Sequence, residues 1–370
     1  MSKIKHRFVI LDIFRGIFAS FVVFYHMSAF SNTAILNNKF ITHADVFVDF
    51  FFVLSGFVVC YSYQTINSAK ELKTFLFKRI RRLYPLHLVL LLLFLFLELT
   101  KLVLYRYVAI NNTLDNSTIT FFTSLFLVNS IKFPGVNDLS WNMVSWSISA
   151  ELISYIVFAF SCFFVAKLKL ERFKIFFYAI LSLVPFWVLY RINGNFKIDY
   201  TYNYGFLRGL IGFFAGTVCF YFFNYSYNKV VLWKRAIFNI LELLMVLIII
   251  ILTCRSEELK AQGYWYEIVF LISIFIFALE KGVISNLIKH SSVLLNIGKY
   301  SYSIYMIHTL FISIFNVIFI RILKLPDTAY TYLFVFNYII IYIVSAWTYK
   351  HIEMRFNKSK TAHKGMNPKI

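Results

Sequence analysis

The sequence predicts an all-α fold, a polytopic membrane bundle of about ten transmembrane helices with both termini in the cytoplasm. Hydrophobic residues make up 60% of the 370 residues and charged residues 15%, against about 25% charged in soluble domains. Apolar stretches of about 20 residues, long enough to cross a bilayer as helices, recur along the whole chain. We therefore expect one membrane domain at residues 1–353, followed by a basic cytoplasmic tail at residues 354–370.

The predicted spanning helices follow one another at residues 8–30, 44–63, 83–105, 143–166, 173–192, 204–223, 236–254, 264–280, 299–321 and 330–350. The first of them carries Asp12 and Arg15 and lacks a small-residue cleavage site, so it is a retained helix and not a signal peptide. The segment 119–130 is too short to span. We expect it to lie re-entrant or flat within the polar loop at 106–142.

The placement of lysine and arginine predicts the orientation, because basic residues favour cytoplasmic loops. With the amino terminus inside, most of the 37 basic residues fall on the cytoplasmic side, within residues 3–7, 70–82, 167–174, 229–235, 281–299 and 350–369. Trp141, Trp146 and Trp265 fall at predicted helix ends, where aromatic belts form at membrane interfaces. We therefore expect a multi-pass protein of the cell inner (plasma) membrane.

Charge and cysteine content argue against two other classes of protein. The formal net charge of +20 could indicate nucleic-acid binding, but the basic residues form short clusters between apolar spans, where anionic lipid head groups and topology explain them. The four cysteines are widely separated and show no CxxC or Cys/His spacing. We therefore expect membrane lipids as partners, no nucleic acid, no metal site and no disulfide framework.

Arg15 and His26 both lie inside the first predicted helix, where burial of charge is costly and therefore indicates function. Arg15 and His26 are 11 positions apart, which places both on one helix face about 16 Å apart along the axis. A fixed cation suits the phosphates or carbonyl of a donor, and an imidazole can take a proton from an acceptor hydroxyl. We expect both to face one cavity; alternatively, Arg15 only pairs with Asp12 and His26 is an interfacial polar residue.

Four later stretches place further polar groups near apolar spans. Residues 48–57 hold Ser55, whose hydroxyl can form hydrogen bonds, and Gly56, which permits close helix approach. Asp49 lies in the same stretch, near the end of its helix, and we expect it to be solvated. The other three stretches contribute Arg79, Arg82 and Pro85 in residues 77–85, Trp146, Ser147 and Glu151 in residues 145–151, and Tyr302 and His308 in residues 298–308.

Taken in order, these motifs resemble the acyltransferase 3 family, integral membrane acyltransferases that modify extracytoplasmic polysaccharides, lipopolysaccharide O-antigens and related glycoconjugates. The resemblance covers residues 8 to about 353 and rests on arginine-x10-histidine at Arg15 and His26, FFxLSGF at 51–57, RxxRLYP at 79–85, WSxSxE at 146–151 and SYxxYxxH ending at His308. It implies a fold of about ten helices, an acyl-CoA co-substrate from the cytoplasm, usually acetyl-CoA, no bound cofactor, and O-acylation of a sugar hydroxyl on a glycan or lipid-linked acceptor.

By the same resemblance His26 and Glu151 are the catalytic residues. The substrate-binding residues that it implies are Arg15, Ser55, Arg79, Arg82, Trp146, Ser147, Tyr302 and His308. The chain departs from the family at Leu152, where a second acidic residue is common, and at residues 352–355, where the carboxy-terminal IE-x-P element lacks its proline. Both departures concern local geometry more than the class of reaction.

Other interpretations of the same residues stay open at this point. A transporter or flippase of a lipid-linked glycan would line its pathway with the same charges, and a polymerase of glycan repeats is also a multi-spanning protein of this size. The basic cluster at 78–82 is also typical of a cytoplasmic loop. His308 could simply bond to a backbone carbonyl within the bundle.

Overall fold

The computed structural model describes residues 7–104 and 116–357, and their regular structure is helical apart from one bridge between Phe196 and Gln262. Within these residues nine segments are long and apolar enough to cross a membrane. Their helices are α1 (Val9–Ser28), α2 (Phe47–Ser62), α3 (Ala69–Leu104), α5 (Ser145–Lys167), α6 (Lys174–Asn193), α7 (Gly205–Val230), α8 (Arg235–Cys254), α12 (Ser292–Asn316) and α13 (Tyr330–Thr348). The predicted polytopic helical bundle is thereby confirmed.

The remaining helices are shorter: α4 (Thr118–Leu125), α9 (Ser256–Leu259), α10 (Tyr264–Phe277), α11 (Val283–Ile288) and α14 (Met354–Asn357). The predicted span at 264–280 corresponds to α10, an apolar helix of 14 residues. Because a helix rises about 1.5 Å per residue, α10 is shorter than the hydrocarbon core of a bilayer.

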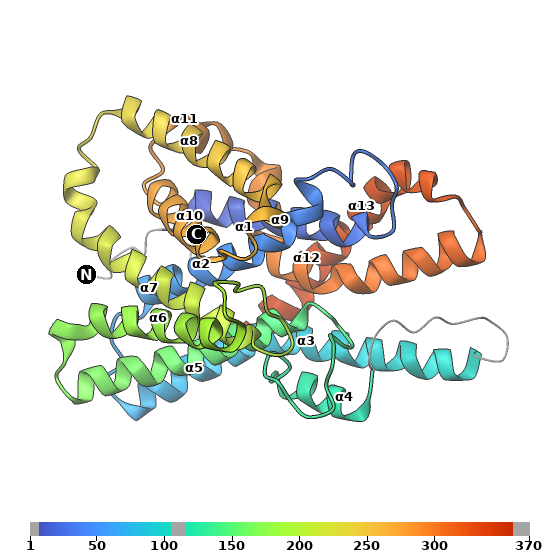
Figure 1. Ribbon diagram of the computed structural model, residues 1–370, viewed down its shortest axis with the longest axis horizontal. Helices are drawn as coiled ribbons and strands as arrows, with labels where there is room; N and C mark the ends of the chain where they lie inside the picture. Colours follow the sequence, from blue (N-terminus) through green and yellow to red (C-terminus); the bar gives the residue numbers. More distant parts are fainter. Residues whose placement is uncertain (1–6, 105–115, 358–370) are drawn as a thin grey trace, which may run out of the picture.

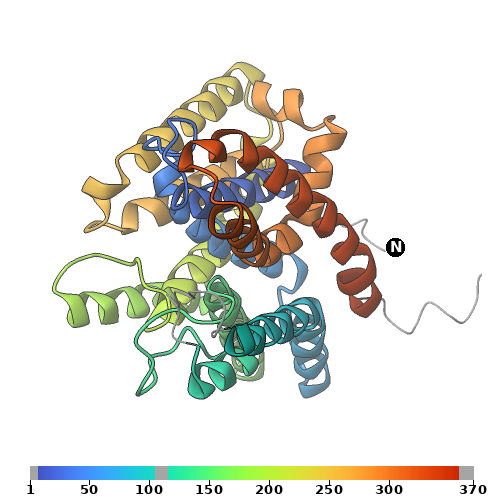
Figure 2. The same cartoon turned by 90° about the vertical axis from the view of Figure 1, so that its right-hand side faces the viewer.

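Helices α1 and α2 lie in the middle of the molecule, with α8 and α10 on one side and α5, α6 and α7 on the other (Figure 1). Helix α1 packs along α12, and α2 packs along α7. In the perpendicular view the cyan and green ribbons of α3 and α4 lie together below the blue ribbons of α1 and α2 (Figure 2). Segments far apart in the sequence therefore surround the two central helices.

Glycines allow the closest of these helix contacts. A Cβ atom on Gly16 would stand 2.4 Å from the backbone nitrogen of Gly298, so α1 and α12 can touch only where both lack a side chain. At the contact between α2 and α7, a Cβ on Gly56 would stand 1.7 Å from the Phe213 carbonyl oxygen. The prediction that Gly56 permits close helix approach is confirmed.

Helix α3 differs most from its predicted bounds. It begins at Ala69, well before residue 83, and runs for 36 residues with Pro85 in its interior. The basic residues 78–82 therefore belong to a helix, and the prediction of a basic cluster ahead of the third helix is wrong. Lysine and arginine are good helix formers, and a membrane helix tolerates an interior proline when neighbouring groups satisfy its backbone.

The predicted short segment at 119–130 corresponds to α4, whose first turn is capped by the Ser117 hydroxyl accepting from the Thr120 backbone N–H. Tyr84 and His87 of α3 bond the carbonyl oxygens of Leu125 and Ser124, so the end of α4 packs against the middle of α3. Part of the predicted 106–142 loop, residues 105–115, lies outside the described residues.

At the carboxy-terminal end, α13 continues through a π-helical turn at Tyr349–Glu353 into α14. Residues 354–357 of the predicted tail are therefore helical, and the rest of that tail lies outside the described residues. A π-helical turn often marks a functional position, and this one carries Glu353.

The expectation of an aromatic belt is wrong for two of the three tryptophans. Trp141 and Trp146 are 4% and 6% exposed, and they pack inside the protein, whereas Trp265 is 41% exposed. The Trp141 indole N–H donates to the Thr120 hydroxyl, which satisfies its polar group without water.

Candidate active site

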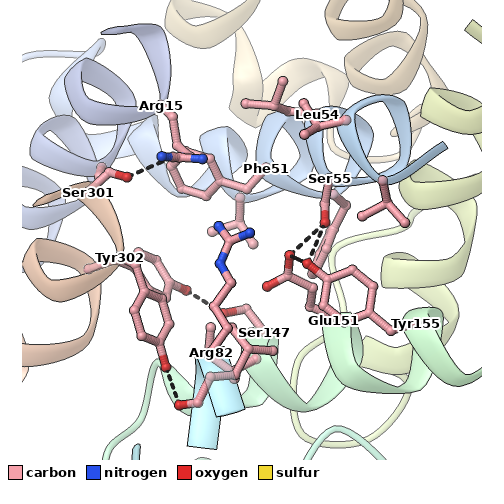
Figure 3. A pocket seen from close by; sticks show the side chains of 18 of the residues that line it. Arg15, Phe51, Leu54, Ser55, Arg82, Ser147, Glu151, Tyr155, Ser301 and Tyr302 are labelled. Atoms are coloured by element: carbon pink, nitrogen blue, oxygen red, sulfur yellow. Dashed lines mark hydrogen bonds between the residues drawn. The ribbon is translucent and has the colours of Figure 1, made fainter. Parts of the chain in front are cut away.

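A cavity of about 100 Å³ lies among α1, α2, α3, α5 and α12. It brings together seven of the residues that the sequence singled out: Arg15, Ser55, Arg79, Arg82, Ser147, Glu151 and Tyr302. Figure 3 shows several of these side chains pointing toward one another across the cavity. Their predicted roles stay predictions, but five helices place them in a single space.

Glu151 is the carboxylate of this cavity. The Ser55 hydroxyl on α2 donates to its Oε1 atom at 2.6 Å, and the Tyr155 hydroxyl donates to the same oxygen at 2.5 Å (Figure 3). Because two neutral donors converge on one oxygen, the other carboxylate oxygen is left to face the cavity and its cations. Helices α2 and α5 are thus joined at the position of Glu151.

Arg15 reaches across from α1 to α12. Its Nε donates to the Ser301 hydroxyl at 2.8 Å, and its Nη2 donates to the Gly298 carbonyl at 3.3 Å. The alternative ion pair with Asp12 is also present, at 3.5 Å. Arg15 therefore pairs with Asp12 and lines the cavity at the same time.

Arg79 and Arg82 enter the cavity from α3 and differ in their surroundings. The Arg79 guanidinium lies over the rings of Tyr63, Phe75 and Tyr155, at 5.4, 5.2 and 5.1 Å from their centroids, which fixes its position by cation–π contacts. Among the described residues, Arg82 has neither a hydrogen bond nor an ion pair. Its guanidinium points toward Arg15, with Glu151 beside it (Figure 3).

The cavity therefore carries an excess of positive charge. Three guanidinium groups line it against one carboxylate, and Glu353 lies near enough to interact electrostatically with Arg82 and Arg15. Glu353 accepts a hydrogen bond from Ser303, which bonds in turn with Thr348 at 3.0 Å, so it is held by its own partners. A cationic space of this kind favours an anionic or strongly polarised ligand.

His26 and His308 form a second group, further along the same two helices. His26 Nδ1 lies 3.2 Å from His308 Nε2 and 2.9 Å from the Val22 carbonyl oxygen. His308 is fully buried, and its Nδ1 lies 2.6 Å from the Tyr305 carbonyl oxygen. His308 therefore bonds to a backbone carbonyl within the bundle, which was one interpretation of the sequence. It also contacts His26.

The shared helix face of Arg15 and His26 is confirmed, because both side chains bond to residues of α12. The expectation that both face one cavity is wrong, since neither His26 nor His308 lines the cavity of Arg15. Tyr305 stands between the two groups: it lines the cavity, and its ring centroid lies 5.9 Å from that of His308. The Tyr305 ring therefore lies at the boundary between the cavity and the histidine pair.

Trp146, another predicted site residue, does not line the cavity. The centroid of its ring lies 5.4 Å from the Cζ atom of Arg208. Arg208 donates hydrogen bonds to both carboxylate oxygens of Asp49. The expectation that Asp49 is solvated is wrong, because its side chain is 1% exposed and paired with Arg208, which is 3% exposed. A carboxylate needs such a partner to be buried at this depth.

Sequence reasoning missed Arg208 as a buried residue, although it lies within the predicted helix 204–223, where any ionisable group indicates a special role. It also missed Tyr155, Ser301 and Tyr305 as cavity residues. Tyr155 follows Glu151 by one helical turn, so the period of the helix could have found it. Within the described residues, no group of three or more His, Cys, Asp or Glu side chains could hold a metal ion.

Comparison with known proteins gives one result. A family model described as an acyltransferase domain matches residues 8–350, which is most of the chain. No curated protein and no solved structure matches the chain.

Proposed function

Because the chain belongs to the acyltransferase 3 family and is a multi-pass membrane acyltransferase, we propose that it moves an acetyl group from cytoplasmic acetyl-CoA to a hydroxyl of an extracytoplasmic or lipid-linked glycan. The proposed location is the cell inner (plasma) membrane. Acyl transfer explains why cations are buried in the cavity. A transporter or flippase would also have to move its substrate across the membrane.

One observation carries this proposal: the Arg82 guanidinium, without a hydrogen-bonding partner among the described residues, faces Arg15 inside the protein. Two like charges that approach one another are unfavourable unless an anion joins them. Acyl-CoA supplies such groups in its phosphates and in the thioester oxygen, which gains negative charge when the carbonyl is attacked. A guanidinium can donate two hydrogen bonds to such oxygens.

The proposed reaction proceeds from the cavity toward the histidine pair. The acyl-CoA binds with its anionic groups at Arg15, Arg79 and Arg82, and its thioester passes Tyr305 to reach His26. The Nε2 of His26 takes the proton of the acceptor hydroxyl, whose oxygen bonds to the thioester carbon. The carbon–sulfur bond breaks, the CoA thiolate leaves with the electron pair, and it takes up the proton that His26 had accepted. Glu151 balances the charge of the guanidiniums.

A second route has His26 itself attack the thioester and carry the acyl group before the sugar hydroxyl takes it. The two routes differ in one observable. Incubation of the purified protein with radiolabelled acetyl-CoA, without acceptor, leaves label on His26 only if the second route operates. Digestion and mass spectrometry of the labelled protein then locate the acyl group.

The proposed function is tested by mass spectrometry of surface polysaccharide from cells that carry wild-type protein, no protein, or the His26→Ala variant. We expect acetyl groups only with the wild type, at equal membrane levels of wild type and variant. The His290→Ala variant, which changes an exposed histidine, serves as the control and keeps acetylation. Acetylated polysaccharide in the His26→Ala cells would remove His26 from the mechanism, and its absence with wild type would contradict the acceptor class.

A further inference from the structure

We propose that His308 is a positioning residue that holds His26 in the tautomer with a free Nε2 lone pair, by accepting the hydrogen of His26 Nδ1. This inference rests on the proposed function in one respect, that His26 acts through its imidazole. It concerns a contact between α12 and α1 that joins residues 282 positions apart.

The tautomer of His308 follows from its backbone contact. Its Nδ1 lies 2.6 Å from the Tyr305 carbonyl oxygen, and a carbonyl oxygen can only accept a hydrogen bond. Nδ1 of His308 therefore carries hydrogen. In a neutral imidazole the other nitrogen is then an acceptor, so Nε2 of His308 offers a lone pair toward His26.

The tautomer of His26 follows in turn. Its Nδ1 faces two acceptors, the Val22 carbonyl oxygen at 2.9 Å and His308 Nε2 at 3.2 Å. Only a hydrogen on Nδ1 makes both contacts favourable, and an unprotonated Nδ1 would set lone pair against lone pair twice. Nε2 of His26 is then the unprotonated nitrogen, free to take a proton or to attack a carbonyl carbon.

Neighbouring groups hold His308 in place. Asn142, just before α5, donates to the Met306 carbonyl at 3.0 Å and accepts from the Thr309 hydroxyl at 2.8 Å. On the other side of the same turn, the Tyr305 hydroxyl lies 2.8 Å from the Ser147 hydroxyl. The turn of α12 that carries His308 is therefore attached on both sides to the start of α5, and the imidazole keeps its direction toward His26.

Two substitutions separate the contact with His26 from the local structure. In His308→Asn, the amide group sits where Nδ1 lies, so it can keep the bond to the Tyr305 carbonyl, but it no longer reaches His26. In His308→Gln, the longer side chain brings an amide oxygen to the place of Nε2 and can accept from His26. The pair therefore differs mainly in the proposed interaction.

We expect kcat of the His308→Asn variant to fall about tenfold or more, the value of one hydrogen bond in the transition state, with KM for the acyl donor unchanged. The His308→Gln variant should recover most of that loss. Wild-type kcat in His308→Asn, or an equal fall in both variants accompanied by a raised KM, would overturn the proposal, because either result indicates no role or a structural one.

A second measurement does not depend on turnover. In protein labelled with ¹⁵N-histidine and purified in lipid nanodiscs, the nitrogen shifts report the tautomer, and the His26→Asn variant identifies the signals of His26. We expect His26 to carry hydrogen on Nδ1 in the wild type and to populate both tautomers in His308→Asn, while His290→Asn leaves the signals of His26 unchanged.

The two measurements keep the two proposals apart. A wild-type protein that transfers no acyl group but shows the expected tautomer would contradict the proposed function and leave the pairing intact. A wild-type His26 with hydrogen on Nε2 would overturn the role of His308 even in an active enzyme. If His308→Asn fails to fold, the wild-type tautomer and the kcat of His308→Gln still decide the matter.

Discussion

Arg208 on α7 donates hydrogen bonds to both carboxylate oxygens of Asp49 on α2, at 2.6 and 2.9 Å, where both side chains are almost completely buried. The same guanidinium donates to Asp199 at 2.8 Å. Helices α2 and α7 also meet at Gly56, next to Ser55. The ion pair therefore holds α2, the helix that brings Ser55 into the cavity, against α7.

Removal of one partner of this pair should destabilise the protein strongly. We expect Asp49→Ala to lower the free energy of unfolding by about 3–5 kcal/mol, because it leaves the Arg208 charge buried with less compensation. The double variant Asp49→Leu with Arg208→Met should lose less, because no fully buried charge is left without a partner. Asp199, which also loses Arg208, is 31% exposed and interacts with Lys260 and Lys197. Thermal unfolding followed by size-exclusion chromatography in detergent measures both. A double variant less stable than Asp49→Ala would contradict this account.

The third member, Asp199, should contribute a pH-dependent part of the stability. Burial acts to raise the pKa of Asp199, but the Arg208 charge, together with Lys260 and Lys197, outweighs it and holds the pKa below its ordinary value. The stabilisation is therefore present above the unfolded-state pKa of about 3.9 and is lost as the pH falls through the lower folded-state value.

We expect the Asp199→Asn variant to unfold at a lower temperature than the wild type at pH 7, with the difference closing as the pH falls below about 3.9. The effect is moderate because the Asp199 side chain is 31% exposed. Asp138→Asn, at an exposed position outside the helices, is the matched control and should show no such difference. A gap between Asp199→Asn and wild type that stays constant with pH would exclude this explanation.

Arg82 should act on donor binding. We expect Arg82→Ala to raise KM for the acyl donor about 10- to 100-fold, through the loss of charge-assisted hydrogen bonds to the donor. Thermal stability should change little, because within the described residues the Arg82 guanidinium has no hydrogen bond to lose. Arg81→Ala is the matched control, since the neighbouring Arg81 does not line the cavity. Initial rates over a range of acetyl-CoA concentrations measure KM. Equal effects of the two substitutions would indicate that the basic residues 78–82 set only the membrane topology and do not bind the donor.

The glycine contact between α1 and α12 should be needed for activity as well as for folding. We expect Gly16→Ala to cost about 1–3 kcal/mol of stability, because its Cβ meets the backbone of Gly298 at 2.4 Å and the helices must separate. Arg15 and His26 would both move away from their partners on α12. Folded Gly16→Ala protein with wild-type kcat would show that the close approach does not position them.

Much of the fold could be predicted from the sequence, because a chain in lipid must satisfy its backbone hydrogen bonds within each helix. The bounds of α3 could not, because arginines that face a protein cavity have the same sequence signature as arginines in a cytoplasmic loop. Asp49 was misjudged for a related reason: its solvation depends on Arg208, which lies 159 positions away in the sequence.

The sequence by itself determined that this protein is a helical membrane bundle, and it placed Arg15 and His26 on one face of α1, because the helical period is a local property of the backbone. Tertiary structure alone decided which residues that face meets: Ser301 for Arg15, and His308 for His26. It also decided that Tyr305 separates the cavity from the histidine pair. Such contacts depend on which helices pack together and how closely. Helix packing in turn depends on how the side chains of residues far apart in the sequence fit against one another.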